Sequence, residues 1–218
     1  METTTTQCSA FNHPEFSLVV EQSIPREDVD WLVLTLEQSV RDGTRYEAGD
    51  LIRVGSMLVQ TELRGSCLFL KEPDLCRMPI FWVDGVTHAL QILRLQKDTA
   101  ESLGLGAKIA FPNIRDSLLV GTDIDANDQS LVLERATLSG SDSGWFIGRD
   151  NTHLDYTCPD NLRRVSVYEG YVNWPRISRF MALPEKTRIE LSNAGIAGSC
   201  DGKALIVREG SFLDKATT

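Results

Sequence analysis

Apolar residues recur at helical spacing in two stretches of the chain. The first stretch, from Ser23 to Gly43, carries five of them on one face: Val29, Leu32, Val33, Leu36 and Val40. The second, from Asp84 to Gly104, carries four: Val86, Leu90, Leu93 and Ala100. Ser23 or its neighbour suits the first N-cap and Asp84 the second, and each glycine stands where a helix would end. The pattern therefore predicts two amphipathic helices.

Short runs of apolar and β-branched residues predict the strands: residues 16–21, 50–63, 66–72, 117–122, 131–137, 144–148, 188–192 and 203–207. The acidic segment 123–130 separates two of these runs and predicts the tip of a hairpin. Pro175 begins a helical turn over residues 175–183. Because strands and helices do not alternate strictly, we expect an α+β fold with two lobes of mixed, mainly antiparallel sheet. Both amphipathic helices fall in the first lobe.

A composition shift marks the expected boundary between the lobes, at Gly140, Ser141 and Ser143. We expect four parts along the chain: a flexible threonine-rich N-terminus at 1–10, an α+β lobe at 11–138, a second lobe at 139–213 and a tail at 214–218.

The composition is that of a globular protein, with 42% hydrophobic and 24% charged residues in a chain of 218. No run approaches the ~20 apolar residues of a membrane span, and the first residues lack a secretory signal, so we expect a cytoplasmic protein. Five scattered cysteines without a Cys-x-x-Cys pair indicate free thiols in a reducing compartment.

Charge narrows the choice of partner. The formal net charge is -9, from 31 acidic and 22 basic residues. Neutralising phosphates requires clustered Lys and Arg, which the chain lacks, so neither nucleic acid nor an anionic membrane is an expected partner. An acidic surface attracts a basic partner and speeds its encounter.

Asp142, Ser143 and Gly144 form the run that surrounds a serine nucleophile in one class of proteases. In that signature a second glycine leaves room for the oxyanion hole, whereas Trp145 stands in its place here. His153 is the one histidine on a nearby predicted loop that a triad could use as its base. We therefore interpret the run as a turn that feeds a buried strand, and keep a hydrolase using Ser143 and His153 as an alternative.

Two sets of residues have the chemistry of metal ligands. His153, Asp155 and Cys158 offer three ligands, but a structural zinc site takes four and no second pair matches. The EF-hand positions 1, 3, 5 and 12 are filled by acidic or amide residues: Asp123, Asp125, Asn127 and Glu134. Asp128 occupies the position of the glycine that the sharp turn requires, and the flanks are predicted strands. No metal or cofactor is therefore expected, although calcium at residues 123–134 stays open.

The four tryptophans are Trp31, Trp82, Trp145 and Trp174. A tryptophan within an apolar run is most often part of a core, because its ring removes a large area from water. We expect partial exposure only for Trp174, which lies between polar Asn173 and Pro175. An exposed aromatic residue among acidic residues is a good anchor for a protein partner.

Several segments together resemble the immunity protein 33 family, also called domain of unknown function 2185: "DSGWFIG", "PDNLRRVSVYEG" and "FMALPEKTRIEL". The matching positions are Asp142, Ser143, Gly144, Trp145, Phe146, Asn161, Val165, Tyr168, Leu183 and Pro184. The first lobe is similar to the extra N-terminal region of longer members. The family contains immunity proteins of bacterial polymorphic toxin and type VI secretion systems, and it supplies no catalytic residues. The resemblance implies that residues 142–146 are a structural signature, which locks Trp145 into the core.

The resemblance and the charge lead to one hypothesis. The chain binds its own toxin in the cytoplasm and occludes the active site; a nuclease toxin, with a cationic groove, would be held by an acidic surface that mimics phosphate. The residues expected to touch the toxin are Asp123, Asp125, Asp128, Asp150, Asp155, Asp160 and Trp174. Besides the hydrolase, the alternative is an adaptor or chaperone that delivers an effector without inhibiting it.

Overall fold

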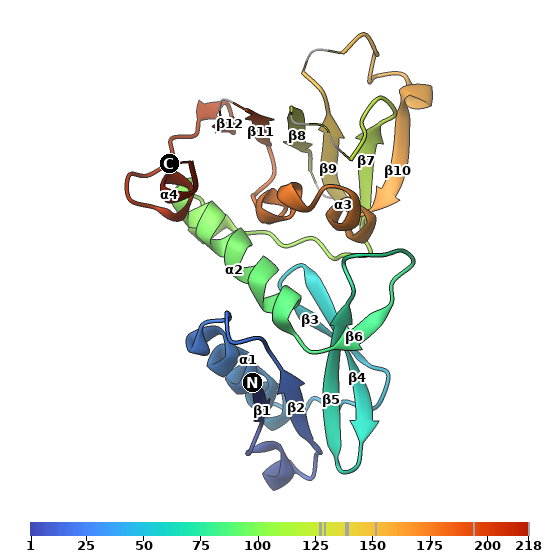
Figure 1. Cartoon of the computed structure of the whole chain (residues 1–218), viewed down its shortest axis with the longest axis vertical. Helices are drawn as coiled ribbons and strands as arrows, with labels where there is room; N and C mark the ends of the chain where they lie inside the picture. Colours follow the sequence, from blue (N-terminus) through green and yellow to red (C-terminus); the bar gives the residue numbers. More distant parts are fainter. Residues whose placement is uncertain (127, 129, 138–139, 151, 194, 218) are drawn as a thin grey trace. The chain divides into compact units, whose positions relative to one another are not determined.

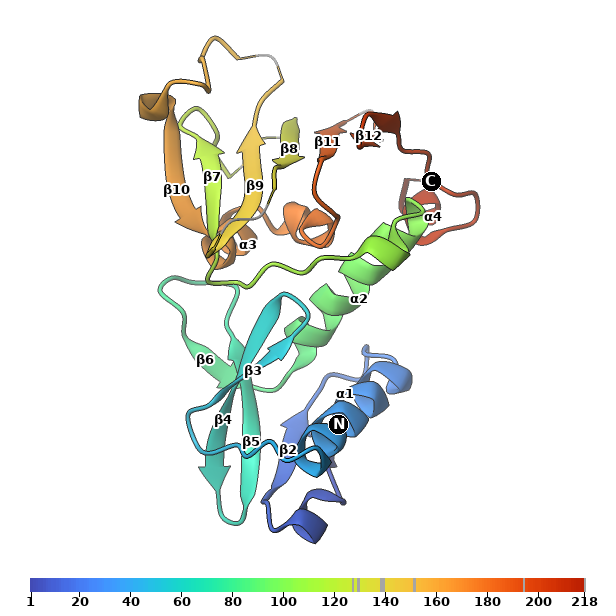
Figure 2. The same ribbon diagram turned by 180° about the vertical axis from the view of Figure 1, so that it is seen from behind.

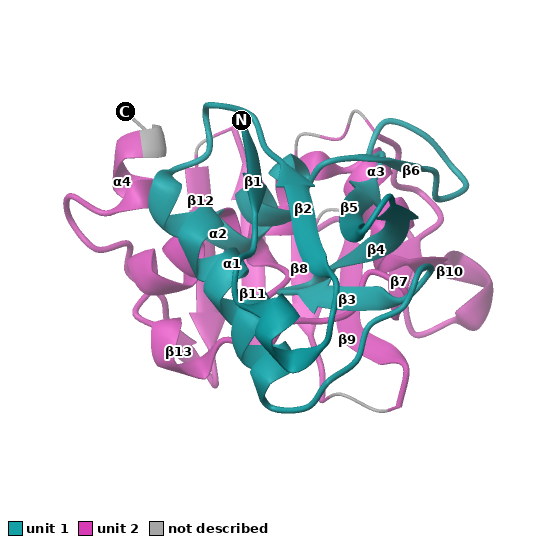
Figure 3. Ribbon diagram, turned by 90° about the horizontal axis from the view of Figure 1, so that it is seen from below, with its two compact units in different colours: residues 1–94 teal, residues 95–218 magenta. Residues whose placement is uncertain are grey.

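A computed structural model describes residues 1–126, 128, 130–137, 140–150, 152–193 and 195–217. The chain divides into two compact units, Met1–Arg94 (unit 1) and Leu95–Thr218 (unit 2), which Figure 3 shows in teal and magenta. Each unit contains its own mixed sheet, and helices accompany both. The predicted α+β class with two sheet-containing lobes is confirmed. None of the described helices combines the length and the apolar character that crossing a membrane requires.

Unit 1 is built on a mixed sheet in the order β1-β2-β5-β4-β3, with β6 also paired to β5. Its strands are β1 (Glu2–Thr4), β2 (Glu15–Val19), β3 (Leu51–Val54), β4 (Met57–Arg64), β5 (Cys67–Pro73) and β6 (Trp82–Asp84). Only β2 and β5 run parallel among these pairs. The N-terminus expected to be flexible forms β1, and a 3-10 helix, η1 (Cys8–Phe11), follows. The amino group of Met1 donates to the carbonyl oxygen of Val20 at 2.7 Å.

Helix α1 (Arg26–Arg41) confirms the first helical pattern. Its buried apolar side chains are Val29, Leu32, Leu36 and Val40. The N-cap is Pro25 rather than Ser23; its backbone is extended, with ψ at 139°, and its side chain makes no capping hydrogen bond. Gly43 ends the helix as predicted, with φ at +101°. Trp31, expected in the core, lies on the outer face and is 41% exposed.

Helix α2 (Thr87–Ser102) belongs to both units, because the division between them falls within it. It begins three residues after Asp84, the expected cap, which instead ends β6. The cap is the buried carboxylate of Glu72 in β5, which accepts from the backbone N–H of His88 at 3.1 Å and of Ala89 at 2.8 Å. A carboxylate at this position satisfies two of the unpaired N–H groups and favours the positive end of the helix dipole.

Unit 2 contains a sheet in the order β10-β7-β9-β8-β11-β12-β13. Figure 1 labels its strands from β10 to β12. Its strands are β7 (Ser117–Gly121), β8 (Leu131–Arg135), β9 (Asp142–Gly148), β10 (Leu162–Ser166), β11 (Thr187–Ser192), β12 (Gly195–Cys200) and β13 (Lys203–Ala204). The helical segments of this unit are η2 (Gly106–Lys108), η3 (Pro159–Asn161), α3 (Val167–Asn173), η4 (Pro175–Phe180) and α4 (Phe212–Thr217). Pro175 begins its helical turn as predicted.

The predicted hairpin between residues 117–122 and 131–137 is wrong. Strand β9 lies between β7 and β8, parallel to the first and antiparallel to the second. Trp145 and Ile147 alternate along β9 and are buried on the same face, so a strand on each side of β9 can continue this apolar face. Strands β7 and β8 therefore share one sheet with β9, which follows the expected boundary at 138, and the chain divides into its compact units between Arg94 and Leu95.

The two faces of this sheet differ. One face carries the buried side chains of the core: Leu118, Val120, Leu133, Trp145, Ile147 and Ile189. Helix α3 packs on it so closely that a Cβ at Gly170 would meet Leu118 at 2.7 Å. On the other face, the strand register places Leu119, Phe146, Glu134 and Arg188 in one row across four strands. We call this second side the open face.

Candidate partner-binding site

The signature forms a bulge at the start of β9. Ser117 of β7 is paired with Asp142 and Leu119 with Phe146, so β9 contains two extra residues over this interval. Gly144 lies in the bulge with φ at +73°, a conformation that favours glycine. The carboxylate of Asp142 accepts from the N–H of Gly144 at 2.9 Å, and the hydroxyl of Ser143 accepts from the N–H of Trp145 at 3.2 Å. Side chains of the signature thus accept hydrogen bonds from backbone N–H groups within the bulge.

Ser143 is not arranged as a nucleophile. Its side chain is fully buried, and its hydroxyl donates to the carbonyl oxygen of Ser117 at 2.6 Å. His153, the base that a triad would require, is exposed on the segment between β9 and β10. A nucleophile must be accessible and bonded to its base, and Ser143 meets neither condition. The geometry matches the predicted structural turn.

Trp145 and Arg135 occupy the core beneath the bulge. Trp145 is 1% exposed, as predicted, and its indole N–H donates to the carbonyl oxygen of Met181 at 2.9 Å. The guanidinium carbon of Arg135 lies 5.5 Å from the centre of the indole ring. Arg135 is 2% exposed, and burial lowers the pKa of its guanidinium to about 10. The sequence pattern did not indicate a role for Arg135, because an arginine near the end of a strand usually points to solvent.

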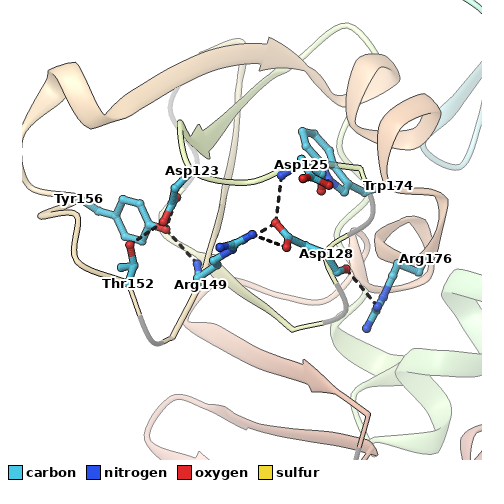
Figure 4. Close-up of polar contacts among 8 residues, drawn as sticks. All are labelled: Asp123, Asp125, Asp128, Arg149, Thr152, Tyr156, Trp174 and Arg176. Atoms are coloured by element: carbon cyan, nitrogen blue, oxygen red, sulfur yellow. Dashed lines mark hydrogen bonds and ion pairs between the residues drawn. The ribbon is translucent and has the colours of Figure 1, made fainter.

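The acidic residues of the hypothesis come from two loops, residues 122–130 and 149–161, which we call the acidic loop pair. Figure 2 shows the second loop, between β9 and β10, extending beyond the strand ends. Residues 127, 129 and 151 lie outside the described residues. Asp123 connects the two loops, because its carboxylate accepts from Thr152 at 2.5 Å and from Tyr156 at 2.7 Å (Figure 4). Burial raises the pKa of Asp123, but these hydrogen bonds outweigh it and leave the pKa below its ordinary value.

A second connection is the ion pair between Asp128 and Arg149 (Figure 4). The other oxygen of the Asp128 carboxylate accepts from Nε of Arg149 at 3.1 Å and from the N–H of Asp125 at 2.9 Å. Burial raises the pKa of Asp128, and the bonds from Arg149 and Asp125 more than offset it, so the pKa is lowered. Asp123 and Asp128 therefore hold the loops together, a role that their sequence pattern did not indicate.

Trp174 also belongs to this cluster, although the expectation of its partial exposure is wrong. It is 2% exposed, and its indole N–H donates to the carbonyl oxygen of Asp125 at 2.8 Å. The guanidinium of Arg163 lies over the ring, 5.4 Å from its centre. Trp174 thus supports the first loop from below and does not offer its ring to a partner in this conformation.

The remaining acidic residues are exposed: Asp125, Asp150, Asp155 and Asp160. Asp150 pairs with Arg188 of β11 at 2.9 Å. Asp155 accepts from the N–H and the hydroxyl of Thr157 at 2.9 and 2.7 Å, which shapes the turn and lowers the pKa of its carboxyl. The structure therefore places the six predicted aspartates on one loop cluster, and Trp174 is buried against it. Four of the six carboxylates are exposed.

The negative charge of unit 2 is concentrated in the acidic loop pair. The two loops contain six acidic residues and one basic residue, Arg149. The rest of residues 95–218 contains 11 acidic and 13 basic residues. Unit 1, in contrast, contains 14 acidic and 8 basic residues. Within unit 2 a basic partner would therefore meet an acidic area in an otherwise slightly basic surrounding.

The candidate metal ligands do not converge. The carboxylate of Asp123 bonds to Thr152 and Tyr156, and Glu134 pairs with Arg188. Asn127 lies outside the described residues. Among those that the structure describes, no three side chains of His, Cys, Asp or Glu are grouped as a metal ion would require.

Tyr156 is a further residue that sequence analysis missed. Its ring packs edge-on against Phe146 of the signature, with ring centres 5.0 Å apart. It occupies space beside two glycines, because a Cβ at Gly121 would meet the ring at 2.6 Å and one at Gly148 at 2.8 Å. A small residue at the end of each of two strands was the available signal, since glycine in a strand often marks a close approach.

Comparison with known families supports the resemblance. Residues 95–199 match the family model of the Imm33-like domain. Neither the search of curated proteins nor that of solved structures found a match. The matched range includes the signature and both acidic loops, and it begins at residue 95, before the start at 139 that the sequence predicts for the immunity-protein-like domain. Residues 95–199 of this chain are therefore an Imm33-like domain, as the resemblance to the immunity protein 33 family predicted.

Proposed function

We propose that the chain is an immunity protein, which binds one bacterial toxin in the cytoplasm and neutralises it by covering the active site. The Imm33-like domain over residues 95–199 is the observation that carries this proposal. The toxin belongs to a polymorphic toxin or type VI secretion system. Ser143 supports binding over catalysis, because its hydroxyl is used to hold two strands together.

The acidic loop pair is the surface that touches the toxin. Its four exposed carboxylates present negative charge, while the internal bonds of Asp123 and Asp128 fix the backbone that carries them. A preorganised loop loses little conformational entropy when it binds. A nuclease toxin fits this surface, because its groove for phosphates is cationic and so is complementary to negative charge.

The product of the adjoining reading frame is the toxin to test, and inhibition distinguishes immunity from delivery. Cells that produce this product should die without the chain and survive with it. With the purified proteins, we expect a one-to-one complex in which the toxin's activity is lost. A complex that keeps full toxin activity would show that the chain is an adaptor and would contradict neutralisation.

The contribution of the loops is tested by removing charge without changing shape. A triple variant, Asp125→Asn with Asp155→Asn and Asp160→Asn, keeps the acceptor oxygen that Asp155 offers to Thr157. We expect association about tenfold slower or more at low salt, and a weaker dependence on ionic strength.

The matched control removes three carboxylates of the same unit outside the loops: Glu101→Gln, Asp201→Asn and Glu209→Gln. These residues are exposed, and removing three carboxylates changes the net charge by the same amount as in the loop variant. If the control and the loop variant lost affinity equally, net charge alone would account for the effect, and the loops would not be the binding surface.

A further inference from the structure

A cavity of about 410 Å³ opens beside the open face, and the signature forms part of its wall. Asp142, Gly144 and Phe146 line one side, and Lys186 and Thr187 line the other. The cavity is separate from the acidic loop pair, none of whose residues lines it. All of its walls belong to unit 2.

Arg135 is the buried cation of this cavity. Its Nη1 donates to the carbonyl oxygens of Ala110, at 2.7 Å, and Leu183, and its Nε donates to that of Ser143 at 3.3 Å. Its Nη2 is buried and has no hydrogen-bond partner in the part of the chain that the structure describes. A guanidinium nitrogen of this kind carries two N–H donors, so the chain leaves both unused.

Thr187 provides the second unused group. It is 1% exposed at the start of β11, lines the same cavity, and its Oγ1 has no partner among the described residues. Buried polar atoms are almost always hydrogen-bonded, and those that are not commonly mark a ligand or a functional site. Two residues that line one cavity each have such an atom, a hydroxyl in Thr187 and a guanidinium nitrogen in Arg135, and both can donate hydrogen to an acceptor.

The balance of charge favours an anion. The lining contains three cations, Arg135, Lys186 and Arg188, against the carboxylates of Glu134 and Asp142. Four of these five charges are already paired: Glu134 with Arg188, which also pairs with Asp150 and Glu190; Asp142 with Arg164; and Lys186 with Asp201. No ion pair of the described residues includes Arg135; its guanidinium is buried beside carbonyl oxygens and the ring of Trp145. A buried cation of this kind is stabilised by any anion that reaches it.

The backbone next to these groups is in an uncommon conformation. Lys186 adopts a left-handed φ of 61°, and its N–H donates to the carbonyl oxygen of Arg135 at 2.7 Å. A residue other than glycine persists in this region only when its surroundings enforce it, and such residues concentrate at binding sites. Lys186 is bonded to the carbonyl of Arg135 in β8 and immediately precedes Thr187 in β11, so it connects the two strands.

We propose that this cavity binds a carboxylate group, with Nη2 of Arg135 and the hydroxyl of Thr187 as its donors. A carboxylate presents two planar acceptor oxygens, which match the two unused groups. The carboxylate comes either from a small molecule or from an acidic side chain or C-terminus of a partner protein.

An NMR titration of the ¹⁵N-labelled chain with acetate, at constant ionic strength, tests the proposal. The reporters are the backbone N–H of Thr187 and the indole N–H of Trp145. We expect saturable shifts at both, with a dissociation constant in the millimolar range, about 1–10 mM. Acetamide, which has the same shape without charge, should produce no saturable shift. The absence of saturable shifts with acetate, or equal shifts with acetamide, would overturn the proposal.

Variants identify the donors. Thr187→Val keeps the shape of the side chain and removes the hydroxyl, so we expect acetate to bind about tenfold more weakly. Thr137→Val is the matched control, because Thr137 is an exposed threonine on the rim of the same cavity, and binding should not change. Arg135→Lys keeps the charge but loses the free Nη2, and should also weaken binding. Acetate that binds both the Thr187 and the Arg135 variants as tightly as the native chain would refute the assignment.

A competition experiment identifies the source of the carboxylate once acetate binds. The product of the adjoining reading frame is titrated with and without saturating acetate. Weaker association in acetate than in chloride at the same ionic strength assigns the carboxylate to that protein, and equal association in the two salts excludes that protein as its source. Because the acetate titration needs no toxin, the cavity can fail while neutralisation holds, and the reverse.

Discussion

The hydroxyl of Ser143 donates to the carbonyl oxygen of Ser117 at 2.6 Å and so joins β9 to β7 where β9 bulges. The same hydroxyl accepts from the N–H of Trp145. One buried side chain thus completes the hydrogen bonding of two strands and fixes the entry of Trp145 into the core. Ser143 of the signature therefore has a structural role, which is to satisfy backbone groups at the bulge.

Replacing Ser143 with Ala should lower the free energy of unfolding by about 1–3 kcal/mol, because it leaves a buried carbonyl and a buried N–H without their partner. Urea unfolding followed by tryptophan fluorescence measures the change. Ser130→Ala, at an exposed serine of the same unit, should be nearly neutral. Equal stability of the two variants would show that the hydroxyl of Ser143 does not support the bulge.

Gly121→Ala should displace the loop of residues 149–161, because the new methyl group would lie 2.6 Å from the ring of Tyr156. The expected cost is about 1–3 kcal/mol, typical of overpacking. In a chain that already carries Tyr156→Ser, the same substitution should cost less, because the contact with the ring is gone and the contact with the carboxylate of Asp123, at 2.8 Å, remains. Additive effects in this double-mutant cycle would contradict the contact.

The connection between the acidic loops should weaken in acid. Asp123 and Asp128 have pKa values lowered in the folded state, so their stabilising effect is present above the ordinary carboxyl pKa and is lost as the pH falls through the folded values. Because both groups are partly exposed, we expect at most about 1 kcal/mol from each. Hydrogen exchange of the loop amides between about pH 6 and pH 3 measures this release.

The control for this acid dependence is the variant Asp123→Asn with Asp128→Asn. It should open the loops at neutral pH and show little further change as the pH falls. A native-like pH profile in this variant would mean that other carboxylates govern the loops.

His88 should stabilise unit 1 more at low pH than at high pH. The hydrogen bond to Glu72, at 3.0 Å, raises the pKa of His88, and burial opposes it more weakly. A raised folded pKa gives a contribution that is complete below the ordinary pKa of about 6.5 and is lost as the pH rises through the folded value. Because the His88 side chain is 48% exposed, we expect less than about 1 kcal/mol.

An NMR titration of the His88 ring measures that pKa directly. Glu72→Gln removes the charge but keeps an acceptor for the helix, and should bring the pKa of His88 down. If the pKa did not change in this variant, the Glu72 carboxylate would not be the cause of the shift.

The sequence pattern predicted the features that depend on residues close together in the chain. The apolar positions of α1 are buried because a period of 3.6 residues places Val29, Leu32 and Leu36 on one side of the helix. Gly43 and Gly104 end their helices because each adopts a positive φ that other residues resist. The α+β class and the burial of Trp145 could be predicted in the same way.

Partners distant in the sequence decided the rest. Strand β9 separates β7 from β8, and no local pattern reveals that a later strand inserts between two earlier ones. Trp174 is buried because the carbonyl of Asp125, far earlier in the chain, accepts from its indole. Arg135 is buried because carbonyls of Ala110 and Leu183 surround its guanidinium. Asp123 and Asp128 were predicted as surface charges, yet their partners lie on the second loop.

Helix α2 has a practical consequence for dissecting this chain. Its first turn is capped by Glu72 of unit 1, while Gln96 in its second half donates to the hydroxyl of Tyr171 and the carbonyl of Ser178 in unit 2. A fragment that begins at residue 95, where the family match begins, would start in the middle of α2. Its first backbone N–H groups would then have no carboxylate as a hydrogen-bond acceptor. Whoever expresses the Imm33-like domain alone should retain the whole of α2 and supply a new acidic cap ahead of Thr87.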